Sequence, residues 1–316
     1  RRVLFRSKYI VSDLHGNGEV YDSILGYLDN VSLVDDVELY INGDLIDRGL
    51  DGFRMLNDVI ERINGKGNVK IHYLGGNHEL MMYQALLKRK PGKSIDNCCD
   101  WMNNGGWVIE GELDGLEDES LIDNLYKPFL GELEIYKKFD EKINDNNILL
   151  VHAAPPKDVY DDCHLKIKDN NLEVEDCVWK RENEYDGFFI PIIVGKNDLG
   201  KDGYLIIKGH TPLKEISGYL YDEEQNVLNI DGGCAYYAIG NFKVDHVPLV
   251  EVEDGRLNIL TFNHNNEIID GHYFDGSFST MPEEELQKCD MLIDHSYDNC
   301  REKNKSLIKE ILEIIK

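Results

Sequence analysis

The chain has 316 residues, of which 42% are hydrophobic, so it can bury a sizeable core in one large domain, alone or with an appendage. Its 60 acidic residues against 34 Lys and Arg give a formal net charge of −26, which repels phosphate backbones and argues against nucleic acid as a partner. No apolar run approaches the ~20 residues that a membrane span requires, so we expect no membrane partner.

The chain starts with a basic stretch, residues 1–7, that lacks the apolar region and cleavage site of a signal peptide. We interpret this stretch as an added tail and exclude it from the functional argument. The seven cysteines are an odd number without the spacing of a disulfide framework. This usage is typical of reduced thiols, so we expect a cytoplasmic protein.

Short apolar runs alternate with helical patterns in the next part of the chain. Residues 8–12, 37–42 and 69–74 are predicted as buried strands, and residues 18–28 and 52–64 as helices with one apolar face. This β-α-β-α-β order predicts an α/β core of parallel strands flanked by helices. Further strands are predicted at residues 147–151, 204–208, 226–230 and 248–252.

Two peripheral segments are predicted to be helical. The polar, helix-like pattern between residues 80 and 142 indicates an insertion beside the core, within a main domain of residues 8–279. Thr280 and Glu283 have the spacing of a capping box, which predicts a C-terminal helical segment over residues 280–316. We expect its last apolar stripe to pack against the core, with binding of a partner protein as the alternative.

Five predicted strands end directly before side chains that ligate metals. The carboxyl ends of parallel strands share one edge of an open α/β sheet, so residues far apart in the sequence can converge there. Neighbouring glycines allow sharp turns and leave room for a ligand. The residues at these five strand ends are Asp13 with His15, Asp44, Asn77 with His78, His152, and His210.

Oxygen and imidazole ligands without thiolate suit Mn²⁺, Fe or Zn²⁺. Two such cations about 4 Å apart need a shared anionic bridge, and they generate hydroxide from bound water near neutral pH. We assign the bridge to Asp44, because this residue is central in the series and its two oxygens can serve both ions. The sequence therefore predicts two divalent metal ions, with Mn²⁺ preferred over Fe or Zn²⁺, whose field would offset the acidic surface locally.

Each motif alone also has an ordinary explanation. Asp13-Leu14-His15 occurs by chance, Asn77 is a favoured helix cap, and a single buried histidine is usually structural. The order, spacing and strand-end placement of all the motifs together indicate one site.

The same motifs resemble those of the calcineurin-like metallophosphoesterases, within them the bacterial and phage branch of the phosphoprotein phosphatase family. The resemblance covers about residues 8 to 211, and it implies a central β-sandwich flanked by helices in place of a single parallel sheet. Its motifs are Asp13-Leu14-His15-Gly16, Gly43 to Gly49, Gly76 to Glu79, Val151-His152-Ala153, Gly209-His210-Thr211, the box Val178 to Glu182 and Ile230 to Gly233.

The resemblance implies a role for each matching residue. The first metal would be held by Asp13 and His15, with Asp44 as the bridge. The second would be held by Asn77, His152 and His210. Phosphoryl oxygens would be bound by Arg48, Arg181 and Asn77, since guanidinium groups fit them with two hydrogen bonds. The leaving oxygen would be protonated by His78, which Asp47 would orient.

Two positions depart from the pattern of the resembled family. Gly75 stands where eukaryotic members usually carry Arg, and Ala154 replaces a common Gly. Neither change removes a predicted ligand, but both leave substrate specificity open.

Three functions compete on this evidence. The first is a phosphomonoesterase of the Ser/Thr protein phosphatase type, which uses a metal-bridging hydroxide on phosphorylated proteins, peptides or small phosphate esters. The second is a hydrolase of dinucleoside polyphosphates or cyclic nucleotides. Asp47 and Glu79 favour the first, because related diadenosine tetraphosphate hydrolases typically differ at both positions. The third is a non-catalytic scaffold, which the complete set of predicted ligands disfavours. The sequence does not indicate an oligomeric state.

Overall fold

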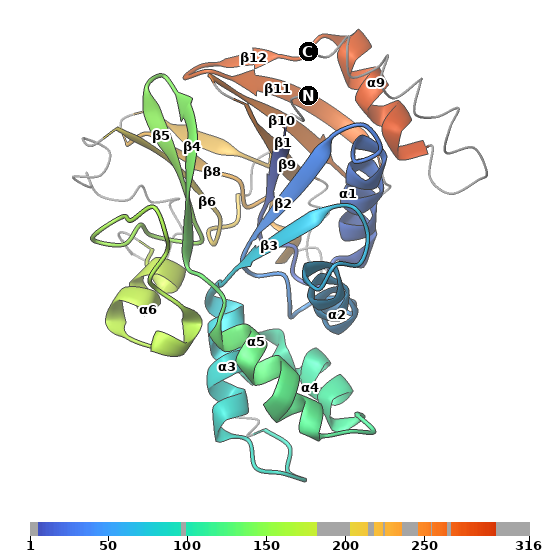
Figure 1. Ribbon diagram of the computed structural model, residues 1–316, viewed down its shortest axis with the longest axis vertical. Helices are drawn as coiled ribbons and strands as arrows, with labels where there is room; N and C mark the ends of the chain where they lie inside the picture. The colour runs from blue at the N-terminus through green and yellow to red at the C-terminus, as the bar shows by residue number, and fades with distance from the viewer. Residues whose placement is uncertain are drawn as a thin grey trace.

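Two mixed β-sheets and the helices around them form the protein in the computed structural model (Figure 1). Strands far apart in the sequence are neighbours in both sheets, so each sheet is completed only when the chain returns to it. The structure describes residues 6–95, 99–181, 203–213, 218–223, 225–235, 246–253, 255–263 and 267–294.

The larger sheet has seven strands in the order β12-β11-β10-β9-β1-β2-β3. Its parallel part joins β1, β2 and β3, while β9 pairs with β1 in the antiparallel sense and starts an antiparallel run to β12. The strands are β1 (Arg6–Val11), β2 (Asp36–Asn42), β3 (Lys70–Leu74), β9 (Val247–Glu253), β10 (Arg256–Phe262), β11 (Ile268–Phe274) and β12 (Phe278–Thr280).

The smaller sheet has five strands in the order β4-β5-β6-β8-β7. In its centre β5, β6 and β8 run parallel, and the two edge strands are antiparallel to their neighbours. The strands are β4 (Tyr136–Ile143), β5 (Asn146–Val151), β6 (Tyr204–Lys208), β7 (Leu220–Asp222) and β8 (Val227–Asn229).

The core between the sheets follows from the alternation of side chains along each strand. In β1, Ile10 belongs to the apolar cluster shared by both sheets, whereas Tyr9 and Val11 belong to the cluster on the other face. In β5, Ile148 and Leu150 contribute to the shared cluster in the same way. Both faces of these strands are buried, which explains why they are continuous apolar runs in the sequence.

Helices cover the outer face of the parallel strands (Figure 1). Helix α1 (Gly18–Val31) starts at Asn17, whose side chain accepts a hydrogen bond from the Val20 amide, and α2 (Gly52–Ile63) packs against β3. Helix α9 (Glu283–Asp294) lies against α1 and β11. The predicted start at Thr280 is wrong, because Thr280 is the last residue of β12 and the helix begins three residues later. No helix among the described residues has the length and apolar character to span a bilayer.

The helical insertion forms a separate layer at one end of the sheets, the lower end in Figure 1. It contains α3 (Asn77–Lys88), a kinked turn at Met102–Gly106, α4 (Trp107–Asp114), a further helical turn at Ile122–Tyr126 and α5 (Lys127–Gly131). Helix α3 packs against α5, and α4 packs against α2. Helix α6 (Leu172–Trp179) lies beside α3.

The prediction of helix up to residue 142 is wrong at its end, because β4 begins at Tyr136. The buried apolar residues of β4 are Tyr136, Phe139 and Ile143, and this spacing resembles a helical face. The pairing with β5 shifts between Phe139 and Lys142, so the strand loses its alternation of period two there. The proposed domain boundaries remain predictions, and most of residues 1–7 and all of 295–316 lie outside the described residues.

The single parallel sheet expected from periodicity is also wrong, since the fold is a sandwich of two mixed sheets. The sandwich implied by the resemblance is confirmed. Strands β10 and β11 carry polar residues and Gly271 among their apolar residues, which hides their alternation.

Candidate active site

The predicted ligands lie on the loops that follow β1, β2, β3, β5 and β6. Backbone hydrogen bonds join these loops directly: the Asp13 amide donates to Gly43 at 3.2 Å, and the His15 amide donates to Asp44 at 2.9 Å. The Gly209 amide donates to the His152 carbonyl at 3.0 Å, which links the ends of β5 and β6. The His210 amide donates to the Asp13 carboxylate at 3.1 Å, so the loops of both sheets meet at one place.

Asp44 lies at the centre of the cluster, with 2% of its surface exposed. Its Oδ2 is 3.5 Å from His15 Nε2, and its Oδ1 is 3.4 Å from His152 Nε2. Each oxygen therefore faces a different histidine. Asp44 takes part in two groups whose ligand atoms lie within 4.8 Å of one another, one with His15 and His78 and one with His152 and His210. A carboxylate between two such groups has the geometry of a bridging ligand.

Backbone carbonyls fix the orientation of two of these imidazoles. His152 Nδ1 lies 2.9 Å from the Asn42 carbonyl, and His15 Nδ1 lies 3.3 Å from the Ile46 carbonyl. Each contact requires a proton on Nδ1 and leaves the lone pair on Nε2, the atom that faces Asp44. His210 has the opposite orientation, with Nδ1 toward the second group. Its Nε2 lies 3.1 Å from both the Trp179 carbonyl and Arg181 Nε, so it donates to the carbonyl in one tautomer and accepts from the guanidinium in the other.

Asn77 supplies an oxygen to the second group. Its Oδ1 lies 3.1 Å from His152 Nε2 and 2.9 Å from His210 Nδ1. When His210 carries its proton on Nε2 and His152 on Nδ1, all three atoms present lone pairs to one another. A cation would turn this repulsion into coordination, so the donor set fits a divalent metal that accepts nitrogen and oxygen ligands. Without the cation a proton has to remain on one imidazole.

That proton belongs to His152. Burial lowers the pKa of His152, but the carboxylates of Asp44 and Asp13 outweigh burial and raise it to about 10. Burial lowers the pKa of His210, and the neighbouring His152 and Arg181 lower it further. The ligands of the second group thus hold one proton that a metal ion would displace.

We expect metal affinity to rise with pH because of this proton. Below pH 10, His152 keeps its proton in the metal-free protein, and metal binding has to release it. The apparent Kd for Mn²⁺ should therefore fall about tenfold per pH unit between pH 6 and 9 for each proton released. Calorimetry in buffers of different ionisation enthalpy measures the release directly. A Kd that does not change over this range would contradict the expectation.

Asp13 does not belong to the group of close ligand atoms in which it was predicted. That group consists of His15, Asp44 and His78. Both oxygens of Asp13 accept the His210 amide at 3.1 Å, and Oδ2 also accepts the Ser12 hydroxyl. Burial raises the pKa of Asp13 to about 6. Its carboxylate thus lies within the cluster but is turned toward donors of the protein, and its role as a ligand remains a prediction.

Two glycines leave the space that this arrangement needs. A Cβ atom on Gly209 would overlap the Asp13 carboxylate, so any side chain there would displace a predicted ligand. A Cβ atom on Gly75 would lie 2.7 Å from the side chain of Ile167. The side chain of Ile167 therefore packs directly against the backbone of Gly75.

The backbone is strained where the site residues lie. Ten non-glycine residues in the described part of the chain have a positive φ between 43° and 69°, and six of them are predicted site residues. The left-handed conformation costs roughly 1–2 kcal/mol for most residues, so it persists only where surrounding contacts enforce it. The six are Asp13, His15, Asp44, Asp47, Arg48 and His210.

The predicted acid pair is completely buried beside Asp44. His78 Nδ1 lies 2.7 Å from Asp47 Oδ2, and both side chains have 0% exposure. Burial lowers the pKa of His78, but the carboxylates of Asp44 and Asp47 raise it above its ordinary value. The Arg48 guanidinium lies 3.2 Å from His78 Nε2 and 3.4 Å from His15 Nε2. The imidazole of His78, whose protonated form these carboxylates favour, and the guanidinium of Arg48 thus lie beside Asp44 and His15.

Arg181 lies at the other side of the cluster. Its guanidinium donates to the His210 carbonyl at 3.2 Å, and its Nε lies 3.1 Å from His210 Nε2. The structure thus brings all the predicted site residues into one connected cluster. Glu182 of the same sequence box lies outside the described residues.

Glu79 supports the cluster, although sequence reasoning gave it no role. This buried carboxylate accepts the amides of Asp44 at 2.8 Å, Gly76 at 2.9 Å and Leu45 at 3.2 Å, and the Tyr73 hydroxyl at 2.5 Å. It therefore fixes the loop that carries Asp44 to the start of α3. Its place in the Gly76 to Glu79 motif was the available signal.

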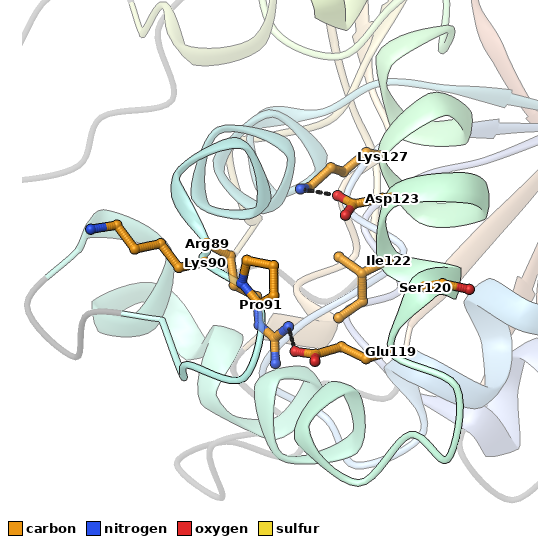
Figure 2. A pocket seen from close by; sticks show the side chains of 8 residues that line it. All are labelled: Arg89, Lys90, Pro91, Glu119, Ser120, Ile122, Asp123 and Lys127. Carbon is orange, nitrogen blue, oxygen red and sulfur yellow. Dashed lines mark hydrogen bonds and ion pairs between the residues drawn. The ribbon is translucent and has the colours of Figure 1, made fainter.

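Figure 2 shows a pocket of about 250 Å³ on the insertion, and none of the predicted site residues lines it. Four of its charged side chains form two ion pairs, Arg89 with Glu119 at 2.6 Å and Lys127 with Asp123. The pocket belongs to the surface of the insertion and not to the cluster.

Three known structures are similar to the chain, and the first of them agrees with this fold. A protein serine/threonine phosphatase from Saccharomyces cerevisiae is 15% identical, with a TM-score of 0.51 over 83% of this chain and 81% of that one. A cold-active protein-tyrosine phosphatase from Shewanella is 17% identical, with a TM-score of 0.46 over 87% and 80%. A putative diadenosine tetraphosphatase is 14% identical, with a TM-score of 0.47 over 83% and 95%. These similarities concern the fold alone.

No curated protein sequence matches the chain. The family model for calcineurin-like phosphoesterases matches residues 9–247, a range that contains every predicted site residue. Together with the two groups of metal-ligating side chains around Asp44, this match supports metal-dependent hydrolysis of phosphoesters. The chain belongs to the calcineurin-like phosphoesterase family.

Proposed function

We propose that the protein hydrolyses phosphate monoesters and acts as a Ser/Thr protein phosphatase-like enzyme on phosphorylated peptides or small phosphate esters. The observation that carries this proposal is the buried His78–Asp47 pair beside Asp44. We place the catalytic domain at residues 8–279, with the helical insertion inside it. We further propose a cytoplasmic enzyme without nucleic-acid or membrane partners, because the charge of −26 repels phosphate backbones and the cysteines of the described residues form no disulfide.

The metal ligands follow from the two groups at Asp44. We assign Asp13 and His15 to one divalent cation, Asn77, His152 and His210 to the other, and Asp44 to both. Nitrogen and oxygen donors favour Mn²⁺, with Fe or Zn²⁺ as alternatives. When bound, the two cations would supply a water molecule of lowered pKa as the nucleophile and positive charge for the phosphoryl group.

Substrate binding is assigned to Arg48, Arg181 and the amide of Asn77. The Arg48 guanidinium faces the imidazoles of His15 and His78, and this contact joins two donors when His78 is protonated. A phosphoryl oxygen is a better partner for this guanidinium, and two parallel hydrogen bonds would orient the ester for attack. The positive charges of Arg48 and Arg181, on two sides of the bound phosphoryl group, would stabilise the transition state.

The acid pair favours an alcohol as the leaving group. A serine or threonine alkoxide is a poor leaving group, so its departure needs a proton. The leaving group of a dinucleoside polyphosphate is a phosphate, which departs readily as an anion and gains little from an acid. His78 has a raised pKa, which favours its protonated form, and Asp47 stabilises the charged imidazole. The pair therefore argues against a dinucleoside polyphosphate as the substrate, whereas a cyclic nucleotide also releases an alkoxide and is separated only by the substrate panel described below.

The variant His78→Ala tests this assignment. We expect kcat for a phosphoserine peptide to fall by roughly 10²–10³-fold, whereas kcat for an activated aryl phosphate should fall much less. The measurement is steady-state kinetics with both substrates at saturating Mn²⁺. The control is His272→Ala, which removes a partly exposed histidine of β11. Equal losses on both substrates would remove His78 from the role of acid.

Hydrolysis of dinucleoside polyphosphates or cyclic nucleotides is the second candidate. The cation groups alone would serve such substrates equally well, because one set of metal ligands handles many phosphoesters. A panel with a phosphopeptide, diadenosine tetraphosphate and a cyclic nucleotide separates the two functions through kcat/KM. A non-catalytic scaffold would bind no metal and would leave an aryl phosphate intact in the presence of Mn²⁺.

A further inference from the structure

We propose that Trp101, a residue of the helical insertion, is a positioning residue that orients the carboxylate of Asp47 toward His78. The proposal rests on the proposed function, since it extends the acid pair by a third member. Trp101 lies in the helical insertion, 54 positions beyond Asp47 in the sequence. The structure brings the two side chains into contact.

The indole N–H is the second side-chain donor to Asp47. Trp101 Nε1 lies 3.0 Å from Oδ1 and 2.9 Å from Oδ2, so one N–H is shared between both oxygens. The other side-chain donor is His78 Nδ1 at 2.7 Å from Oδ2. Trp101 is 1% exposed and Asp47 is 0% exposed, so water cannot replace the indole. A buried carboxylate that loses one of two donors is held less firmly and becomes costly to keep charged.

The turn that follows Trp101 fixes the indole ring. A Cβ atom on Gly106 would lie 2.5 Å from the ring, so the backbone of this glycine packs directly against the indole. Gly105 has a φ of 105°, and its carbonyl accepts the Arg48 amide at 3.4 Å. The insertion thus contacts two consecutive residues of the catalytic loop, Asp47 and Arg48, which both have a positive φ.

This arrangement predicts for which substrates the indole of Trp101 increases the rate. Trp101 contacts no predicted metal ligand through a hydrogen bond among the described residues, and it acts on the reaction through Asp47 and His78. Its removal should therefore affect substrates in proportion to their need for a proton. A structural role alone would lower the rates for all substrates equally.

The test is Trp101→Phe, which keeps an aromatic ring and removes the donor. We expect kcat/KM for a phosphoserine peptide to fall about tenfold and that for an activated aryl phosphate less than about threefold. Trp107→Phe is the matched control, because Trp107 belongs to the same insertion and is 60% exposed. The control should leave both rates unchanged. Equal losses on the two substrates for Trp101→Phe would overturn the proposal.

The double variant Asp47→Asn with Trp101→Phe shows whether the two residues act together. Since Trp101 acts through Asp47, the second substitution should add less than about twofold to the loss from Asp47→Asn alone. Multiplication of the two separate losses would overturn the proposal. If Trp101→Phe does not fold, the indole N–H resonance of the wild-type protein decides. We expect Asp47→Asn to shift the Trp101 signal and to leave that of Trp107 in place, and an unmoved Trp101 signal would overturn the proposal.

The proposed function and this inference fail separately. If His78→Ala shows no dependence on the leaving group, the acid role itself is wrong. If His78→Ala shows the dependence and Trp101→Phe does not, the acid pair stands and only the role of Trp101 is wrong.

Discussion

Asp44→Asn is expected to lower kcat by at least about 10³-fold, since two cations contribute several kcal/mol and each ~1.4 kcal/mol is worth a factor of ten. The two oxygens of Asp44 face His15 Nε2 and His152 Nε2 at 3.5 and 3.4 Å. The amide of Asn turns an NH₂ group toward one of these histidines and removes the negative charge. One cation site loses a ligand, and both lose their shared anion.

Metal analysis separates this loss from a loss of folding. The wild-type protein should bind two Mn²⁺ ions per chain and Asp44→Asn one or none, with the far-UV circular dichroism spectrum unchanged. Asp140→Asn is the control, because Asp140 is an exposed residue of β4 and its substitution removes the same charge. Asp44→Asn with two tightly bound ions and more than a tenth of the wild-type rate would be incompatible with a bridging role.

Glu79→Gln is expected to destabilise the protein by about 3 kcal/mol, because a buried donor left without an acceptor costs roughly 1–3 kcal/mol. Glu79 accepts four hydrogen bonds, two on each oxygen. The NH₂ group of glutamine cannot accept a hydrogen bond. The two donors that contact this end of the Glu79 side chain would therefore face a third donor. The Asp44 loop would lose its anchor to the start of α3, and we expect activity to fall at the same time.

Urea denaturation measures this effect. Tyr73→Phe is the matched comparison, since it removes one of the four donors and leaves the carboxylate in place. This variant should lose about 1 kcal/mol in the free energy of unfolding. If Glu79→Gln is no less stable than Tyr73→Phe, the carboxylate does not fix the loop in the way described.

The convergence of the ligands was predictable from the sequence because each follows an apolar run. Asp13, Asp44 and Asn77 lie at the carboxyl ends of parallel strands of one sheet, and His152 and His210 at those of the other. The position of a residue at the end of a strand depends only on the nearby sequence, so the apolar run before it is enough to predict it. That two different sheets contribute was not visible, because the pairing of strands depends on contacts between distant segments.

The contacts that surround the ligands were less predictable. Nothing in the spacing of the insertion indicates that Trp101 reaches Asp47, since this contact depends on the kink at Gly105. The orientation of Asp13 toward the His210 amide likewise depends on how the ends of β1 and β6 meet. The role of a residue within a motif can be predicted from the sequence. The residues that hold the motif in place can be identified only once the fold is known.

Anomalous diffraction from a crystal soaked in Mn²⁺ tests the central claim most directly. We predict two peaks, one on each side of the Asp44 carboxylate, the first contacted by His15 and the second by Asn77, His152 and His210. A single peak remote from Asp44, or none at a concentration of Mn²⁺ that supports hydrolysis, would contradict the assignment of a shared bridging ligand.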